Sequence, residues 1–224
     1  MRFLRRHWYD VSVGIALAIF SCLALFWDKL SILQRLSLAN LGVLFLHFFE
    51  EFGFPGGFSK LANAVLYPSP DAPADRYPLN QNSVMIGNWV FAILFYIPPI
   101  FFPNLIWLGL MPILFGAIGQ SLSHLVVNNI AMRTWYNGGL ASTVFGHIPI
   151  AFLYIGYVQR HGLATAWDYV IGMAYAVIAY ALFFRRLMFA LADKNSPYPF
   201  DEVEMARFDR LNRKPLKYSF GAAT

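Results

Sequence analysis

A histidine and two glutamates stand together in an apolar stretch where charge is costly. His47, Glu50 and Glu51 occur in LFLHFFEEFGF, and spacings of three and four place them on neighbouring parts of one helix surface. An ionised group at mid-membrane costs roughly 2.5 to 3.5 kcal/mol, and less near the membrane edge. Two adjacent glutamates there need a compensating partner, for which a bound cation or a proton is suited. The alternative is that they cap a span and pair with Arg133 or Lys60.

Further polar residues interrupt later apolar stretches. Gln120, His124 and Asn128 recur every four residues, so they form a polar stripe on one helix face, where it serves either a site or an interhelical hydrogen-bond seam. His147 precedes Pro149 by two residues, and it is either a ligand or a structural hydrogen-bonding residue. Asn88, beside Trp89, suits a site or an interfacial anchor.

These residue types point to a metal site of nitrogen and oxygen ligands. The single cysteine, Cys22, excludes a disulfide framework and a cysteine zinc site. His47, His124 and His147 with Glu50 or Glu51 would supply three or four ligands for a divalent metal, zinc first, with iron or manganese as alternatives. One open position would hold water, and the remaining glutamate would act as general base. That constellation is typical of a hydrolase.

The elements that position these residues are membrane spans. Hydrophobic residues make up 58% of the 224 residues, charged ones 13%, and mean hydropathy is +0.50, which excludes disordered, fibrous, coiled-coil and soluble-enzyme classes. A spanning helix needs about 20 apolar residues. The sequence predicts an all-α, polytopic six-helix transmembrane bundle with spans at 10–27, 36–52, 84–102, 105–133, 138–157 and 164–184.

Basic residues predict the orientation. Fourteen lysines and arginines fall on one side of the six spans and three on the other, which puts both termini in the cytoplasm. We expect a transmembrane domain at 1–193, with a proline-rich irregular connection at 55–83. A basic cytoplasmic tail follows at 194–224, and it is either a helix at the lipid headgroups or a solvated segment.

The polar residues are predicted to lie at similar depths in their spans. At 1.5 Å per residue, His47, Asn88, His124, Asn128 and His147 lie about 6 to 14 Å from the cytoplasmic ends of four spans. They therefore predict one polar cavity that opens to the cytoplasm. Asn88, Asn128 and Arg133 are the expected substrate contacts, and Arg133 is the one singled out for an anionic headgroup among the arginines at the mouth, which include Arg185 and Arg186.

The motifs themselves resemble a known family. HFFEE at 47–51 is similar to the signature of the HXXEE-domain proteins, small bacterial integral membrane proteins, and SHLVVN at 123–128 looks like their later histidine and asparagine pair. YNGGLAS at 136–142 is similar to a Tyr-x-Pro-Gly-x-x-Thr turn of that family, with Gly138 in place of proline and Ser142 in place of threonine. The resemblance covers about residues 40–155 and implies no assigned activity.

The sequence thus predicts an intramembrane metal-dependent hydrolase in the bacterial inner (cytoplasmic) membrane. It would act from the cytoplasmic side on a lipid-like or amphipathic small molecule, with membrane lipids and no nucleic acid as partners. One alternative is a proton-coupled transporter or carrier that uses the same histidines and glutamates as a relay. The other is a structural or regulatory membrane protein.

Overall fold

Six helices that are long and apolar enough to cross a membrane make up most of the chain. The computed structural model describes residues 2–211, and within that range it contains helices and turns but no strand. The predicted all-helical class and the number of six spans are therefore confirmed. The spans are Arg2–Leu25, Ile32–Gly53, Gln81–Phe101, Ile106–Met132, Leu140–Arg160 and Ala166–Ala190.

Most spans combine α-helical segments with π-helical turns, in which the backbone is locally wider. The segments are α1 (Arg2–Leu25); α2 (Ile32–Phe48) and η2 (Phe49–Gly53); α4 (Gln81–Phe91), η4 (Ala92–Tyr96) and α5 (Pro98–Phe101); α6 (Ile106–Leu114), η5 (Phe115–Gly119), η6 (Leu122–Val127) and α7 (Asn128–Met132); α8 (Leu140–Ser142), η7 (Thr143–His147) and α9 (Ile148–Arg160); α10 (Ala166–Ile178), η8 (Ala179–Phe184) and α11 (Arg185–Ala190). The 3-10 turn η1 (Trp27–Lys29) joins the first two spans.

The predicted boundaries differ most at the start of the first span and at the end of the last span. The first helix begins at Arg2 rather than at residue 10, and the last ends at Ala190 rather than at 184. Hydropathy marks only the apolar run, whereas helical backbone extends beyond it. The first helix is kinked at His7 (φ −116°, ψ 18°), so residues 2–6 form a separate helical turn before the straight part. The other boundaries agree within four residues. Three of the helix starts are capped by side chains, since Ser31, Asn80 and Thr165 each form a capping box.

The connection at 55–83 is more ordered than its prolines suggest. Two short helical segments, α3 (Phe58–Lys60) and η3 (Leu61–Leu66), lie within it. The buried Asn63 side chain donates to the carbonyls of Ala74 and Leu79, both at 2.8 Å, and accepts from the Leu79 amide at 3.0 Å. One asparagine thus replaces the backbone pairing that the loop lacks.

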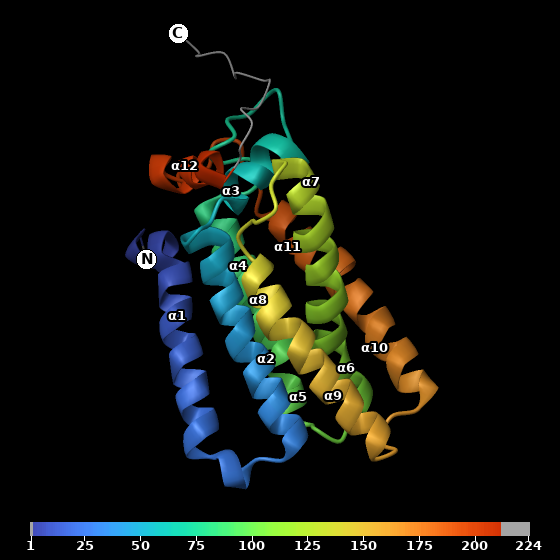
Figure 1. The fold of residues 1–224 in the computed structure, drawn as a ribbon. Helices are drawn as coiled ribbons and strands as arrows, with labels where there is room; N and C mark the ends of the chain where they lie inside the picture. The colour runs from blue at the N-terminus through green and yellow to red at the C-terminus, as the bar shows by residue number, and fades with distance from the viewer. Residues whose placement is uncertain (1, 212–224) are drawn as a thin grey trace.

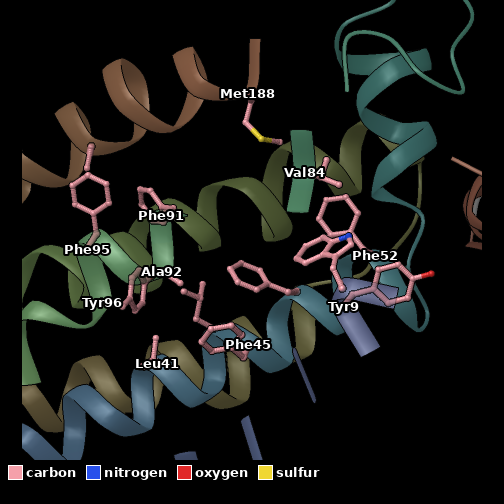
Figure 2. Packing of buried hydrophobic residues seen from close by; sticks show 14 of the residues in the cluster. Tyr9, Leu41, Phe45, Phe52, Val84, Phe91, Ala92, Phe95, Tyr96 and Met188 are labelled. Carbon is pink, nitrogen blue, oxygen red and sulfur yellow. The ribbon is translucent and has the colours of Figure 1, made fainter. Parts of the chain in front are cut away.

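Aromatic side chains fill the bundle interior between α1, α2, α4 and α11. Figure 2 shows Leu41 and Phe45 of α2 facing Ala92 and Tyr96, while Met188 reaches in from α11. Trp8 and Tyr9 close one end of this cluster and are each 1% exposed. Their packing fixes the end of α2 that carries His47.

The N-terminus and the C-terminal helix α12 (Glu202–Leu211) lie at the same end of the bundle (Figure 1). Arg6 forms ion pairs with Asp201 and Glu204, and Phe208 of α12 is fully buried. This part of the predicted tail packs on protein. The tail residues Arg213, Lys214 and Lys217 lie outside the described range.

Candidate metal centre

Three predicted ligands converge inside the bundle. His47, Glu51 and His124 are buried, and one ligand atom from each lies within 4.8 Å of the others. One Glu51 carboxylate oxygen lies 3.9 Å from His47 Nε2, and the other lies 3.8 Å from His124 Nε2. Two atoms on one tetrahedral ion at 2.0–2.2 Å are about 3.4 Å apart. The observed spacing therefore leaves room for an ion after a small closing movement.

Wide helical turns present two of the three ligands, Glu51 and His124, whereas His47 lies in the regular helix α2. Glu50 and Glu51 lie in η2, His124 lies in η6, and His147 is the last residue of η7. Turns of this type occur frequently at functional sites, because the extra residue redirects side chains that regular helix geometry would turn away. Local backbone geometry thus allows three spans to aim at one point.

Each of the three histidines has one satisfied and one unsatisfied ring nitrogen. The Nε2 atoms of His47, His124 and His147 are buried and have no hydrogen-bond partner among the described residues. The Nδ1 atoms, in contrast, are all paired. Their partners are Ser142 Oγ at 2.9 Å from His47, Asn137 Oδ1 at 2.7 Å from His124, and Asn40 Oδ1 at 2.8 Å from His147.

This pairing sets the tautomers. Asn137 is oriented by its amide nitrogen, which donates 2.7 Å bonds to the His124 carbonyl and to Asn129 Oδ1. Its oxygen therefore accepts from His124 Nδ1–H, and the Nε2 lone pair is left free. An oxygen acceptor behind the ring is the arrangement found in metal-ligating histidines. A buried polar atom without a partner costs about 1–3 kcal/mol, so three in one place indicate a ligand.

Glu50, predicted as a ligand or base, has other partners. Its Oε1 accepts from Tyr136 Oη at 2.9 Å and from the Ala141 amide at 2.8 Å. Its Oε2 accepts from the Ser142 amide at 2.7 Å and from Ser142 Oγ at 2.5 Å. These four bonds use the acceptor capacity of a carboxylate. Glu50 therefore anchors the turn at 136–142, and its carboxylate is not part of the converging set.

Ser142 links Glu50 to His47. Its hydroxyl proton goes to Glu50, so the oxygen accepts from His47 Nδ1–H. The pKa of Tyr136 is raised to about 12, chiefly by partial burial and less by the negative charge of Glu50 and the hydrogen bond to it. The phenol therefore stays protonated and donates to Glu50. The histidine and both glutamates of the motif thus have separate tasks.

A glycine lets this turn approach both rings. Gly139 has a φ of 100°, a conformation that L side chains disfavour. A Cβ added there would lie 2.7 Å from His47 Cε1 and would overlap the His124 ring. Backbone therefore fills the space beside the imidazoles, and no side chain competes for it.

His147, the fifth predicted ligand, lies at the edge of the group. Its ring centroid is 5.8 Å from that of His47, compared with 4.8 Å between His47 and His124. It is outside the set within 4.8 Å, but its free Nε2 belongs to the same buried region. His147 is thus a neighbour of the three converging ligands.

An aromatic cavity of about 100 Å³ opens beside the cluster. His47 and Glu51 line it, and so does Asn88, whose amide donates to the Val84 carbonyl at 2.8 Å. Arg185, at the start of α11, also lines the cavity. The other lining residues are Leu44, Phe48, Phe52, Phe58, Tyr67, Leu79, Phe91, Phe115, Gln120, Ser123, Tyr180, Phe184, Met188 and Phe189.

The other two predicted substrate contacts lie elsewhere. Asn128 is buried behind His124, with its amide 3.3 Å from His124 Nδ1. Arg133 is exposed and takes a left-handed conformation (φ 50°) that ends α7. It lines a separate surface groove with Trp135 and not the aromatic cavity. The turn at the end of α7 directs Arg133 away from the site, which spacing along a helix does not show.

A family model corresponds to this part of the chain. The family is described as protein of unknown function with HXXEE motif, and its model matches residues 38–154, just over half of the sequence. The chain belongs to the HXXEE family. In this HXXEE protein the matched segment contains all three histidines and both glutamates discussed above. No curated protein and no solved structure matches the chain.

Three supporting residues of this HXXEE protein were missed or undervalued in the sequence. Asn40 lies seven residues before His47, hence two turns along the same helix face, and this polar residue in an apolar span was a usable signal. Asn137 had none, because its role depends on a turn that folds back onto another helix. Ser142 was noticed only through the family resemblance.

Proposed function

We propose that this protein is an intramembrane metal-dependent enzyme, a hydrolase that acts on a lipid-like or amphipathic substrate. The observation that carries the proposal is the set of three buried histidine Nε2 atoms without partners, two of which lie 3.9 and 3.8 Å from Glu51 carboxylate oxygens. Each ring is already oriented from its Nδ1 side. Such preorganisation suits ligand binding and has no evident use in packing.

The donor set suits a divalent transition metal. His47, His124 and Glu51 would supply two imidazoles and one carboxylate, a combination that binds zinc in hydrolytic enzymes and also suits iron or manganese. A bound ion of this kind makes water a nucleophile near neutral pH and polarises a carbonyl or phosphoryl oxygen. The cavity beside Glu51 is where a substrate would meet that water.

His147 is the proposed general base. Its Nδ1 hydrogen bond to Asn40 leaves the Nε2 lone pair free, and no acidic group is hydrogen-bonded to it among the described residues. The water oxygen would bond to the substrate carbonyl carbon or phosphorus while its proton moves to His147 Nε2. That proton would then pass to the leaving group as the scissile bond breaks. Glu50 would hold His47 in position through Ser142.

The site lies toward the end of the bundle that carries α12, since Arg207 of α12 donates to the Phe52 carbonyl at 2.6 Å. The excess of basic residues at that end supports a cytoplasmic orientation with both termini inside. We therefore propose access from the cytoplasmic side of the bacterial cytoplasmic membrane. On this view residues 1–193 form the transmembrane unit, and the chain from 194 onward covers its cytoplasmic end.

Metal content of the detergent-purified protein tests the proposal. We expect about one equivalent of a transition metal per chain by elemental analysis. Glu51→Gln and His124→Gln should each lose most of it, whereas His161→Gln, at an exposed position on the far end, should retain it. Metal-free wild-type protein that also fails to take up zinc, iron or manganese would refute the metal site, as would full retention in both site variants.

A second function uses the same residues. The ring centroid of His47 lies 4.8 Å from that of His124 and 5.8 Å from that of His147, and a proton-coupled carrier would use such closely spaced rings as a relay. In that case the purified protein would bind no metal. Reconstituted vesicles would instead show proton movement that His47→Gln abolishes.

A further inference from the structure

The aromatic cavity has a polar wall at the metal centre and a cationic group at its rim. His47 and Glu51 line it at one place, and Arg185 lines it at the start of α11. Most of the remaining lining is aromatic or aliphatic, and phenylalanine is its commonest residue. A ligand that fits must therefore combine an apolar body with at least one polar group.

Arg185 is not neutralised by a carboxylate in the described part of the chain. Arg6 and Arg76 form ion pairs with Asp201 and Asp75, but Arg185 has no acidic partner among residues 2–211. Its guanidinium lies 5.6 Å from the Phe189 ring centroid. A cation held over an aromatic face keeps its donors free, and a guanidinium pairs with phosphate or carboxylate oxygens through two parallel hydrogen bonds.

The rim is on the outer side of the last span. Tyr180 and Phe189 line the cavity, yet they are exposed, at 43% and 37%. Both belong to the span Ala166–Ala190, so in a bilayer their exposed surfaces face lipid or the headgroup boundary. A ligand would enter sideways from the membrane, and in the proposed orientation it would come from the cytoplasmic leaflet.

Size restricts the apolar part. Pockets for drug-sized ligands measure about 300–1,000 Å³, whereas this cavity measures about 100 Å³. One hydrocarbon chain can enter partway, but two chains side by side cannot.

We propose that the cavity binds a single-chain anionic amphiphile, with its chain among the phenylalanines and its anionic oxygens on Arg185. Under the proposed function, on which this assignment of a substrate class rests, the bond to be cleaved would lie within reach of Glu51. Arg185 rather than Arg133 then determines the charge of the substrate. Ser123, a small residue in the lining, marks where chain length can be controlled.

The test uses dodecylphosphonate, an anionic amphiphile whose carbon–phosphorus bond resists hydrolysis. Its binding to purified protein in a neutral detergent would be measured by equilibrium dialysis, with dodecyltrimethylammonium as the cationic counterpart. We expect Arg185→Gln to weaken phosphonate binding at least tenfold. The matched control Arg133→Gln, an exposed arginine at the end of another span, should bind like wild type.

A cavity-filling variant separates charge from shape. Ser123→Phe should weaken binding of the phosphonate because it fills the cavity. Arg185→Gln should reduce the difference in affinity between the anionic and the cationic probe. Equal affinity of wild type and Arg185→Gln for the phosphonate would overturn the proposal, as would equal affinity of wild type for both probes.

Metal content of the same samples keeps the two proposals distinguishable. Metal bound in wild type and in Arg185→Gln, with phosphonate binding unaffected by the substitution, would refute the substrate assignment alone. Wild-type protein without metal whose phosphonate binding still depends on Arg185 would refute the enzyme and leave an anionic-amphiphile site.

Discussion

The carboxylates of the adjacent residues Glu50 and Glu51 face different partners. Glu50 accepts four hydrogen bonds from the turn at 136–142, while Glu51 lies between His47 Nε2 and His124 Nε2. The π-helical turn η2 that contains both residues allows this divergence. One glutamate serves the fold and the other is available to an ion.

Replacing each glutamate should therefore produce different defects. Glu50→Gln turns an acceptor into a donor facing backbone amides, so we expect a loss of about 1.5–3 kcal/mol in stability, seen as a lower melting temperature in detergent, with metal retained in the folded fraction. Glu51→Gln should leave the melting temperature of the metal-free protein near the wild-type value and remove metal. The reverse pattern would contradict this assignment of roles.

The hydroxyl at position 142 should tune metal affinity through His47. Ser142→Ala removes the acceptor for His47 Nδ1–H, and loss of such a partner typically weakens metal binding about 10- to 100-fold. Ser142→Thr keeps the hydroxyl and should bind metal within a few-fold of wild type. Competition with a chromophoric chelator measures both. Equal weakening in the two variants would mean that the hydroxyl does not act through the ring.

Gly139 should tolerate no side chain. Gly139→Ala combines a left-handed backbone, which costs about 1–2 kcal/mol for an L residue, with overlap against the His47 and His124 rings. We expect the variant to lose metal. We also expect its free energy of unfolding to fall by more than the cost of the left-handed backbone. Gly162→Ala is the matched control, because Gly162 has a φ of 62° and nothing within 4 Å of an added Cβ. Similar losses in both would show that the rings can move aside.

The N-terminus and α12 lie at the same end of the bundle, so labelling of α12 tests on which side of the membrane that end lies. In a Cys22→Ser background, Glu202→Cys and Gly162→Cys place thiols at exposed positions at opposite ends of the bundle (Figure 1). A membrane-impermeant maleimide added to intact bacterial cells should label position 162 and not position 202. Labelling of position 202 alone would reverse the proposed orientation.

Much of the architecture was predictable because lipid imposes strict rules on sequence. Apolar runs give the spans, since each must satisfy its own backbone hydrogen bonds. An apolar run says nothing about the residues outside it. Arg2 and Arg6 are helical, but they precede the kink at His7, and Asn63 orders a proline-rich connection.

The site was predictable only in part. Isolated polar residues in apolar spans pointed to His47, Glu51 and His124, because burial of such groups demands a reason. Their supporting partners depend on which turn packs against which helix, and Asn137 and the contacts of Glu50 follow from that packing. Arg133 and Arg185 both flank spans in the sequence, and only the direction in which each helix ends distinguishes them.

The cavity mouth on the outer surface of the last span carries a kinetic consequence. A reactant that arrives through the bilayer is diluted by lipid rather than by water. Turnover would then follow its mole fraction in the membrane: adding inert lipid at constant total substrate should slow the reaction, whereas adding buffer should not. Tyr180 and Phe189, exposed at that mouth, would make the rate sensitive to acyl-chain order in the surrounding leaflet.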